Sequence, residues 1–110
     1  MAYYRNIVPM DLGGKKVLVH IDMRAGLALS AKYGKAATKK VHNATQGGDV
    51  SVLIFTLVFA LQKHQPNEYT FESIMDMDPQ PAIEVVEEVI FESLMAFQYG
   101  ATGPVETNPM

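Results

Sequence analysis

The feature that most constrains this 110-residue chain is one apolar segment, Val50 to Leu61, in which only Ser51 and Thr56 are polar. Twelve residues are too few to span a bilayer as a helix. Asp49 before the segment and Pro66 after it are typical of a helix start and a helix stop. A helix that is apolar on nearly all sides is either central in its domain or shared with another molecule. Because so short a chain has few other elements to cover it, we expect a partner or a second copy to do so.

Two β-prone runs precede this segment and predict an N-terminal hairpin. Residues 3–8 form the first run and residues 16–21 the second, and residues 11–14 between them include two adjacent glycines suited to a turn. Pro9 is expected to end the ladder pairing or to mark an edge, because proline donates no backbone hydrogen bond.

Helical patterns fill the chain from there to residue 100. They cover residues 23–33, 35–43, 50–64, 71–77 and 82–99. In the first of these helices, Leu27, Ala28 and Ala31 provide the apolar spacing. The predicted fold class is small α+β, mainly α with an N-terminal β-hairpin and four to five helices. We expect one domain over residues 1–100 and a flexible tail over residues 101–110, which have no core-forming pattern.

Charge is divided sharply along the chain. Residues 1–63 hold all nine Lys and Arg and three acids, a net +6, whereas residues 64–110 hold nine acids and no Lys or Arg, a net −9. This division allows attraction between the halves of one molecule or between neighbouring molecules, and it is also consistent with two independently solvated faces. Nucleic-acid binding is disfavoured because the basic residues are dispersed and the isoelectric point is about 5.5.

No pattern in the sequence favours catalysis or metal binding. Cysteine is absent, the paired glycines lack the residues of a phosphate loop, and no serine lies in a nucleophile motif. His20 and Asp22 share a face at a strand end, but a histidine beside a helix cap explains them better than a metal pair does. We therefore expect a protein that is not an enzyme, with no catalytic residues, cofactor or metal.

Two groups of residues are candidate contacts with partners. The apolar group, from the central segment, consists of Phe55, Val58, Phe59 and Leu61. The acidic group, from the polar face of the last helix, consists of Glu84, Glu88 and Glu92. Each group has an alternative interpretation, because apolar side chains are commonly buried for packing alone and carboxylates commonly form a solvated helix face.

The order of these features resembles one protein family. A hairpin opens into the helix that begins Ile21–Leu29, a break follows at Tyr33–Lys35, and the apolar helix within 49–64 ends in a Lys-His pair. A short polar loop then leads into an acidic helix that begins at Thr70. Over residues 3–98, this pattern resembles the tail assembly chaperones of long-tailed bacteriophages (siphophages) and prophages.

The resemblance implies a non-enzymatic role in the cytoplasm of the host cell. Such chaperones coat the tape measure protein, keep it soluble and help to recruit tail tube subunits, and they are absent from the mature virion. Many occur in two lengths produced by translational frameshifting, and a chain of this length resembles the shorter product. Self-association is also expected, with the basic front of one copy meeting the acidic back of the next.

Two other functions remain open at this point. One is a ring-forming phage structural subunit, such as a head–tail connector or a tail terminator. The other is a small regulatory binding protein. For the chaperone we expect neither a membrane nor nucleic acid as a partner.

Overall fold

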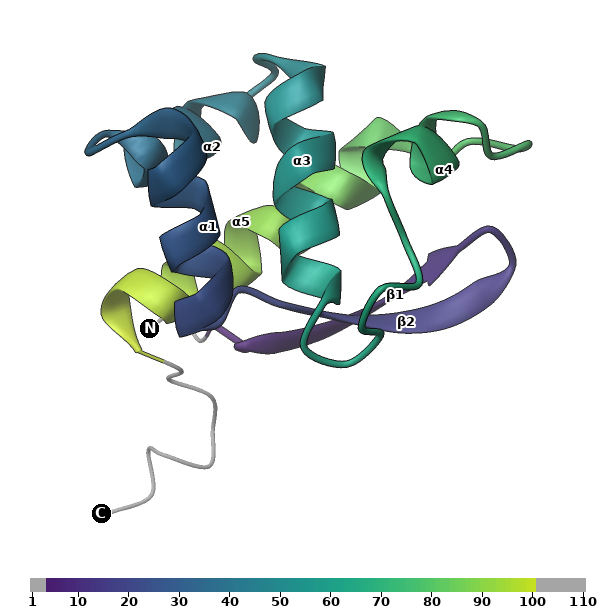
Figure 1. Cartoon of the computed structure of the whole chain (residues 1–110), viewed down its shortest axis with the longest axis horizontal. Helices are drawn as coiled ribbons and strands as arrows, with labels where there is room; N and C mark the ends of the chain where they lie inside the picture. Colours follow the sequence, from purple (N-terminus) through teal and green to yellow (C-terminus); the bar gives the residue numbers. More distant parts are fainter. Residues whose placement is uncertain (1–3, 101–110) are drawn as a thin grey trace.

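The structure is a computed structural model and describes residues 4–100. A hairpin of β1 (Ile7–Leu12) and β2 (Lys15–His20) comes first (Figure 1). Five helices follow: α1 (Met23–Tyr33), α2 (Ala37–Ala44), α3 (Val50–Leu61), α4 (Phe71–Met75) and α5 (Ile83–Tyr99). The predicted small α+β fold with an N-terminal hairpin is therefore confirmed. The tail predicted for residues 101–110 lies outside the described residues.

The hairpin differs from the prediction in where its first strand runs. β1 starts at Ile7 and continues through Pro9 to Leu12, so proline does not end it. Gly13 and Gly14 form a two-residue turn and both have positive φ, +61° and +80°, as a type I′ turn requires. The turn therefore lies at the two glycines of the predicted 11–14 turn, and β1 runs directly up to it.

The register explains why β1 tolerates a proline. A two-residue turn makes Leu12 and Lys15 a hydrogen-bonded pair. Along an antiparallel ladder, hydrogen-bonded pairs alternate with pairs that exchange no backbone hydrogen bonds. Pro9 lies opposite Leu18 in a pair without ladder bonds. Its missing N–H therefore costs the hairpin no hydrogen bond, in agreement with the preference of proline for edge strands.

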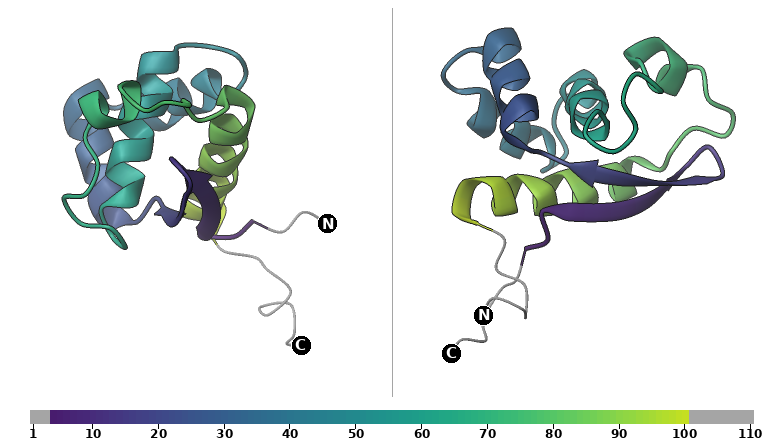
Figure 2. Two further views of the ribbon diagram at one scale, coloured as in Figure 1. Left: turned by 90° about the vertical axis from the view of Figure 1, so that its right-hand side faces the viewer. Right: turned by 60° about the horizontal axis from the view of Figure 1, so that its bottom comes forward.

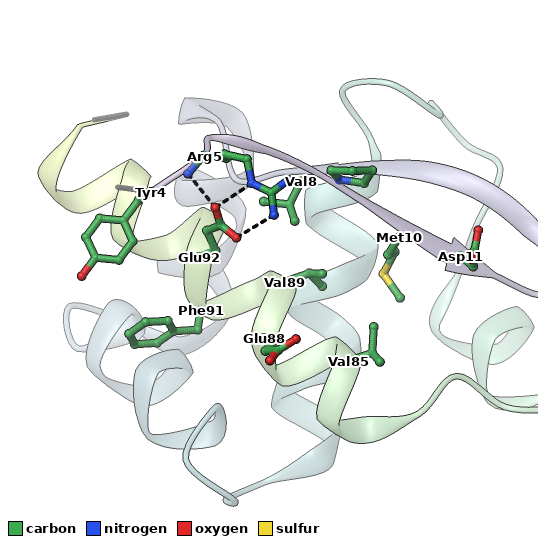
Figure 3. A pocket seen from close by; sticks show the side chains of 11 residues that line it. Tyr4, Arg5, Val8, Met10, Asp11, Val85, Glu88, Val89, Phe91 and Glu92 are labelled. Atoms are coloured by element: carbon green, nitrogen blue, oxygen red, sulfur yellow. Dashed lines mark hydrogen bonds and ion pairs between the residues drawn. The ribbon is translucent and has the colours of Figure 1, made fainter. Parts of the chain in front are cut away.

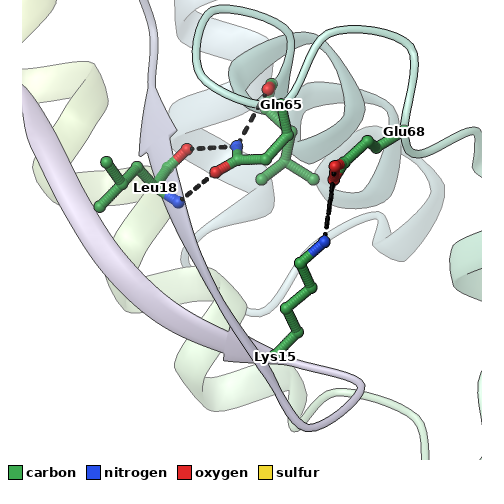
Figure 4. A network of polar contacts seen from close by, with 5 residues as sticks. Lys15, Leu18, Gln65 and Glu68 are labelled. Carbon is green, nitrogen blue, oxygen red and sulfur yellow. Dashed lines mark hydrogen bonds and ion pairs between the residues drawn. The ribbon is translucent and has the colours of Figure 1, made fainter.

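The outer edge of β2 is paired by a side chain instead of a third strand. The Leu18 N–H donates to Gln65 Oε1 at 2.9 Å, and Gln65 Nε2 donates back to the Leu18 carbonyl at 3.0 Å (Figure 4). Nearby, Lys15 forms an ion pair with Glu68 at 3.3 Å. The loop after α3 is thereby fixed to the hairpin.

Helix α3 lies at the centre of the fold. It packs against β2 and against the other four helices, and seven of its twelve residues are buried (Figures 1 and 2). Helix α5 runs beside the hairpin, with α1, α3 and α4 over them (Figure 2). Of the two expected positions for the apolar helix, central or shared, the fold therefore uses the central one. None of the helices within residues 4–100 has the length and apolarity needed to span a membrane.

The helix ends largely follow the sequence. Asp22 accepts the Ala25 N–H at 2.9 Å and Asp49 accepts the Ser51 N–H at 2.9 Å, so both cap helices as expected. Gly100, with φ +89°, ends α5. Helices α3 and α4 end earlier than predicted, at Leu61 and Met75, because turns follow each of them.

Candidate interaction surfaces

The predicted apolar group divides into one core residue and three partly covered ones. Leu61 is 0% exposed, so its prediction as a contact with partners is wrong: the chain itself covers this side chain. Phe55, Val58 and Phe59 are partly exposed and pack against the core. The expectation that a small domain leaves α3 to a partner fails because the hairpin and four helices are enough to enclose most of it.

Phe55 already has partners within the molecule. Its ring stacks on Phe71 of α4, with the ring centroids 4.2 Å apart and the planes 20° apart. The Lys32 ammonium of α1 lies 3.9 Å from the Phe55 ring centroid, within the range of a cation–π contact. Phe55 therefore joins α1, α3 and α4 and is a poor candidate for a free contact.

Helix α1 leaves two large apolar side chains mostly exposed. Met23 is 70% exposed and Leu27 is 65% exposed, and their spacing of four residues places both on one side of the helix. Ala25 and Leu29 are buried on the opposite side. We call Met23 and Leu27 the α1 stripe. The apolar spacing that the sequence indicates for this helix included Leu27, which the fold leaves exposed.

The elements that carry and adjoin the α1 stripe hold many of the cations of the chain. Five exposed cations occupy α1, α2 and the turn between them: Arg24, Lys32, Lys35, Lys39 and Lys40. Within residues 4–100, the two ion pairs closer than 4 Å are Arg5–Glu92 and Lys15–Glu68, so none of these five is paired with a carboxylate at that distance. An acidic partner can therefore approach these elements without displacing an existing ion pair.

The predicted acidic group is also divided by the structure. Glu84 and Glu88 are exposed on α5, whereas Glu92 is bound by Arg5 through three hydrogen bonds of 2.8 to 3.0 Å (Figure 3). These bonds, chiefly those of the Arg5 side chain, lower the pKa of Glu92 below its usual range. Glu92 therefore fastens the N-terminal segment to α5, and Glu84 and Glu88 are left as the free carboxylates of the group.

A groove separates β1 from α5. It has a volume of ≈ 660 Å³ and is lined by Val8, Pro9, Met10, Val85, Glu88 and Val89, among others (Figure 3). A second hollow of ≈ 350 Å³ shares Glu88 and Phe91 with it and adds Glu84 and Glu87. We call the first of these the β1–α5 groove. Three carboxylates line it, those of Asp11, Glu88 and Glu92, whereas α1, α2 and the turn between them carry five exposed cations.

His20 meets a different partner from the one considered in the sequence. Its Nδ1 lies 3.3 Å from His64 Nε2, and the two rings are stacked with centroids 5.5 Å apart. Asp22 instead caps α1. Burial lowers the pKa of His20, and the charges of His64 and Lys63 add to this while Asp22 opposes it. Among residues 4–100, no group of three or more His, Asp or Glu side chains is placed to hold a metal ion.

Comparisons with family models, curated proteins and solved structures gave no match. The function of the chain is therefore inferred from its own surfaces together with the resemblance in its sequence. Three surface features enter that inference: the α1 stripe, the exposed cations of α1 and α2, and the β1–α5 groove.

Proposed function

We propose that the protein is a non-enzymatic phage tail assembly chaperone, which binds the tape measure protein and helps to recruit tail tube subunits in the host cytoplasm. It would leave the assembly before the virion is complete. The observation that carries the proposal is the α1 stripe: Met23 and Leu27 are exposed although one chain buries most of the far more apolar α3. The order of sequence features over residues 3–98 supports the same function.

The α1 stripe is suited to an amphipathic helical partner. Two apolar side chains one helical turn apart match the spacing of apolar residues along a partner helix. The exposed cations of α1 and α2 favour a partner that also carries acidic residues. One such contact is small and weak, but a long helical protein such as a tape measure protein repeats it many times, and many linked contacts give stable coating.

Self-association follows from the separation of charge. The unpaired cations of α1 and α2 and the free carboxylates of α5 lie on different elements, so one copy can present its basic side to the acidic side of the next. A head-to-tail contact of this kind does not close on itself in a pair and builds arcs or helices. Light scattering at about 10 mM and about 1 M salt tests it, because the screening length falls from about 30 Å to about 3 Å.

The main experiment is co-purification with the tape measure protein of the same phage. The double variant Met23→Lys/Leu27→Lys should remain folded, since both side chains are exposed, and should lose the tape measure protein. Met75→Lys, an exposed apolar residue on α4, is the matched control and should retain it. Circular dichroism checks the fold of each variant.

Two results would overturn the proposal. If the wild-type chain does not bind or solubilise the tape measure protein, the chaperone function is wrong. If the chain is found in purified virions, a ring-forming structural subunit is the better interpretation. Full binding by the double variant would leave the function standing but remove the α1 stripe as its surface.

A further inference from the structure

The β1–α5 groove has a buried apolar floor, and apolar side chains on its α5 side stay partly in contact with water. Val8, Met10 and Val89 are buried at its base, while Val85 is 42% exposed and Phe91 is partly exposed on the α5 side. Covering such side chains is favourable by roughly 25 cal/mol for each Å² removed from water. The α5 side of the groove therefore favours an occupant with apolar side chains of its own.

Carboxylates border this floor. Asp11 of β1 and Glu88 of α5 are exposed and form no ion pair with residues 4–100. Glu92 is held by Arg5 away from Asp11 along the groove, so its charge is already compensated (Figure 3). An occupant that carries cations can pair with the two free carboxylates, whereas an acidic one is repelled.

The edge of β1 adds backbone acceptors to the same groove. Because the ladder bonds fall at residues 8, 10 and 12, the peptide groups of Ile7, Pro9 and Asp11 point outward. Pro9 has no N–H, so the edge offers three carbonyl acceptors against two donors. On the other edge of the hairpin Gln65 pairs with Leu18, but no side chain within residues 4–100 pairs with the edge of β1 in this way.

We propose that the β1–α5 groove docks an extended segment of a partner protein in which Lys or Arg alternates with apolar residues. In an extended chain successive side chains point to opposite sides, so the apolar residues reach the floor while the cations reach the carboxylates and carbonyls at the rim. This surface is separate from the α1 stripe, and the proposal goes beyond the chaperone function and does not depend on it.

The groove fits this occupant better than it fits other parts of the same chain. Residues 101–110 contain Glu106 and no Lys or Arg, so their charge is wrong for it. The lysines of a second copy that are grouped on α2 lie on a helix, which cannot continue along the edge of a strand. An extended basic segment satisfies the floor, the rim and the strand edge together.

The test uses a synthetic peptide, acetyl-Val-Lys-Val-Lys-Val-Lys-Val-amide, titrated into the ¹⁵N-labelled full chain. We expect saturable chemical-shift changes at residues 7–11 and 85–92 and weaker binding at high salt. Glu88→Lys should weaken the binding about tenfold. Glu72→Lys changes an exposed acid on α4, outside the groove, and should leave the affinity unchanged.

Several results would overturn the proposal. These are equal binding of the same peptide with Glu in place of Lys, shift changes centred on α1, or no saturable binding. Loss of self-association in Glu88→Lys without any binding of the peptide would mean that the groove is an interface between copies. Binding of the tape measure protein is measured in parallel, so the failure of one proposal can be told from the failure of the other.

Discussion

Helices α1 and α3 differ in how far the fold covers their apolar side chains. Helix α3 is apolar in ten of its twelve residues, and seven of the twelve are buried. Among these, Leu61 is fully enclosed. Helix α1 is less apolar, yet it leaves Met23 and Leu27 in water. The difference lies in the number of neighbours, because α3 packs against the hairpin and four helices while α1 packs mainly against α2 and α3. Apolar content therefore predicts burial only when enough elements are available to cover the helix.

The largest expected effect compares one leucine from each helix. Leu61→Ala should lower the free energy of unfolding by about 2–5 kcal/mol, because it leaves a cavity in the core. Leu27→Ala should change it by less than about 0.5 kcal/mol, because this side chain is 65% exposed. Urea denaturation of both variants measures the difference. Equal losses would mean that α1 is as well packed as α3 and would contradict the comparison.

Local chemistry in the sequence was enough to predict most of the fold. Asp22 and Asp49 cap helices because a carboxylate accepts first-turn N–H groups wherever the chain goes next. Gly13 and Gly14 form the turn because both positions need positive φ. These features depend on neighbours in sequence, so they could be predicted without knowledge of the tertiary structure.

Contacts between distant residues could not be predicted in this way. Arg5 and Glu92 are 87 residues apart, and Gln65 and Leu18 are 47 apart. Nothing in the local pattern distinguishes Glu92 from Glu84 or Gln65 from an ordinary loop residue. The sequence therefore predicted only part of the candidate contacts. It showed which residue types are available, whereas the packing of distant segments decided which of those residues remain exposed and without an ion pair.

The next expected effect concerns the inward side of α1. A Cβ at Gly26 would lie 2.5 Å from Phe97 Cζ, so Gly26→Ala forces the ring to move. Such overpacking costs about 1–3 kcal/mol and exceeds the gain of about 1 kcal/mol from replacing a helical glycine, which leaves a net loss of about 1 kcal/mol.

A double-mutant cycle isolates the contact of Gly26 with Phe97. In a Phe97→Leu background, Gly26→Ala should become stabilising, because the obstructing ring is gone. Ser30→Ala, on the exposed side of α1, should be slightly stabilising in both backgrounds. If Gly26→Ala is stabilising in the wild-type chain, the inward side of α1 is looser than its contact with Phe97 implies, and the two sides of α1 differ less than proposed.

The smallest expected effect lies where the end of β2 meets the turn after α3, at His20 and His64. Burial lowers the pKa of His20 below its ordinary value of 6.5, with His64 and Lys63 adding to the shift and Asp22 opposing it. The unfolded chain then takes up this proton more readily than the folded chain does. The contribution to stability is therefore complete above about pH 6.5 and is lost as the pH falls through the lower pKa of the folded state.

Urea denaturation between about pH 7.5 and pH 5 should show stability falling with pH in the wild-type chain and a flatter profile in His20→Gln. His42→Gln, in which the altered residue packs against Phe91 instead of this pair, should keep the wild-type slope. A slope unchanged by His20→Gln would show that protonation of His20 does not weaken the contact between β2 and the turn after α3.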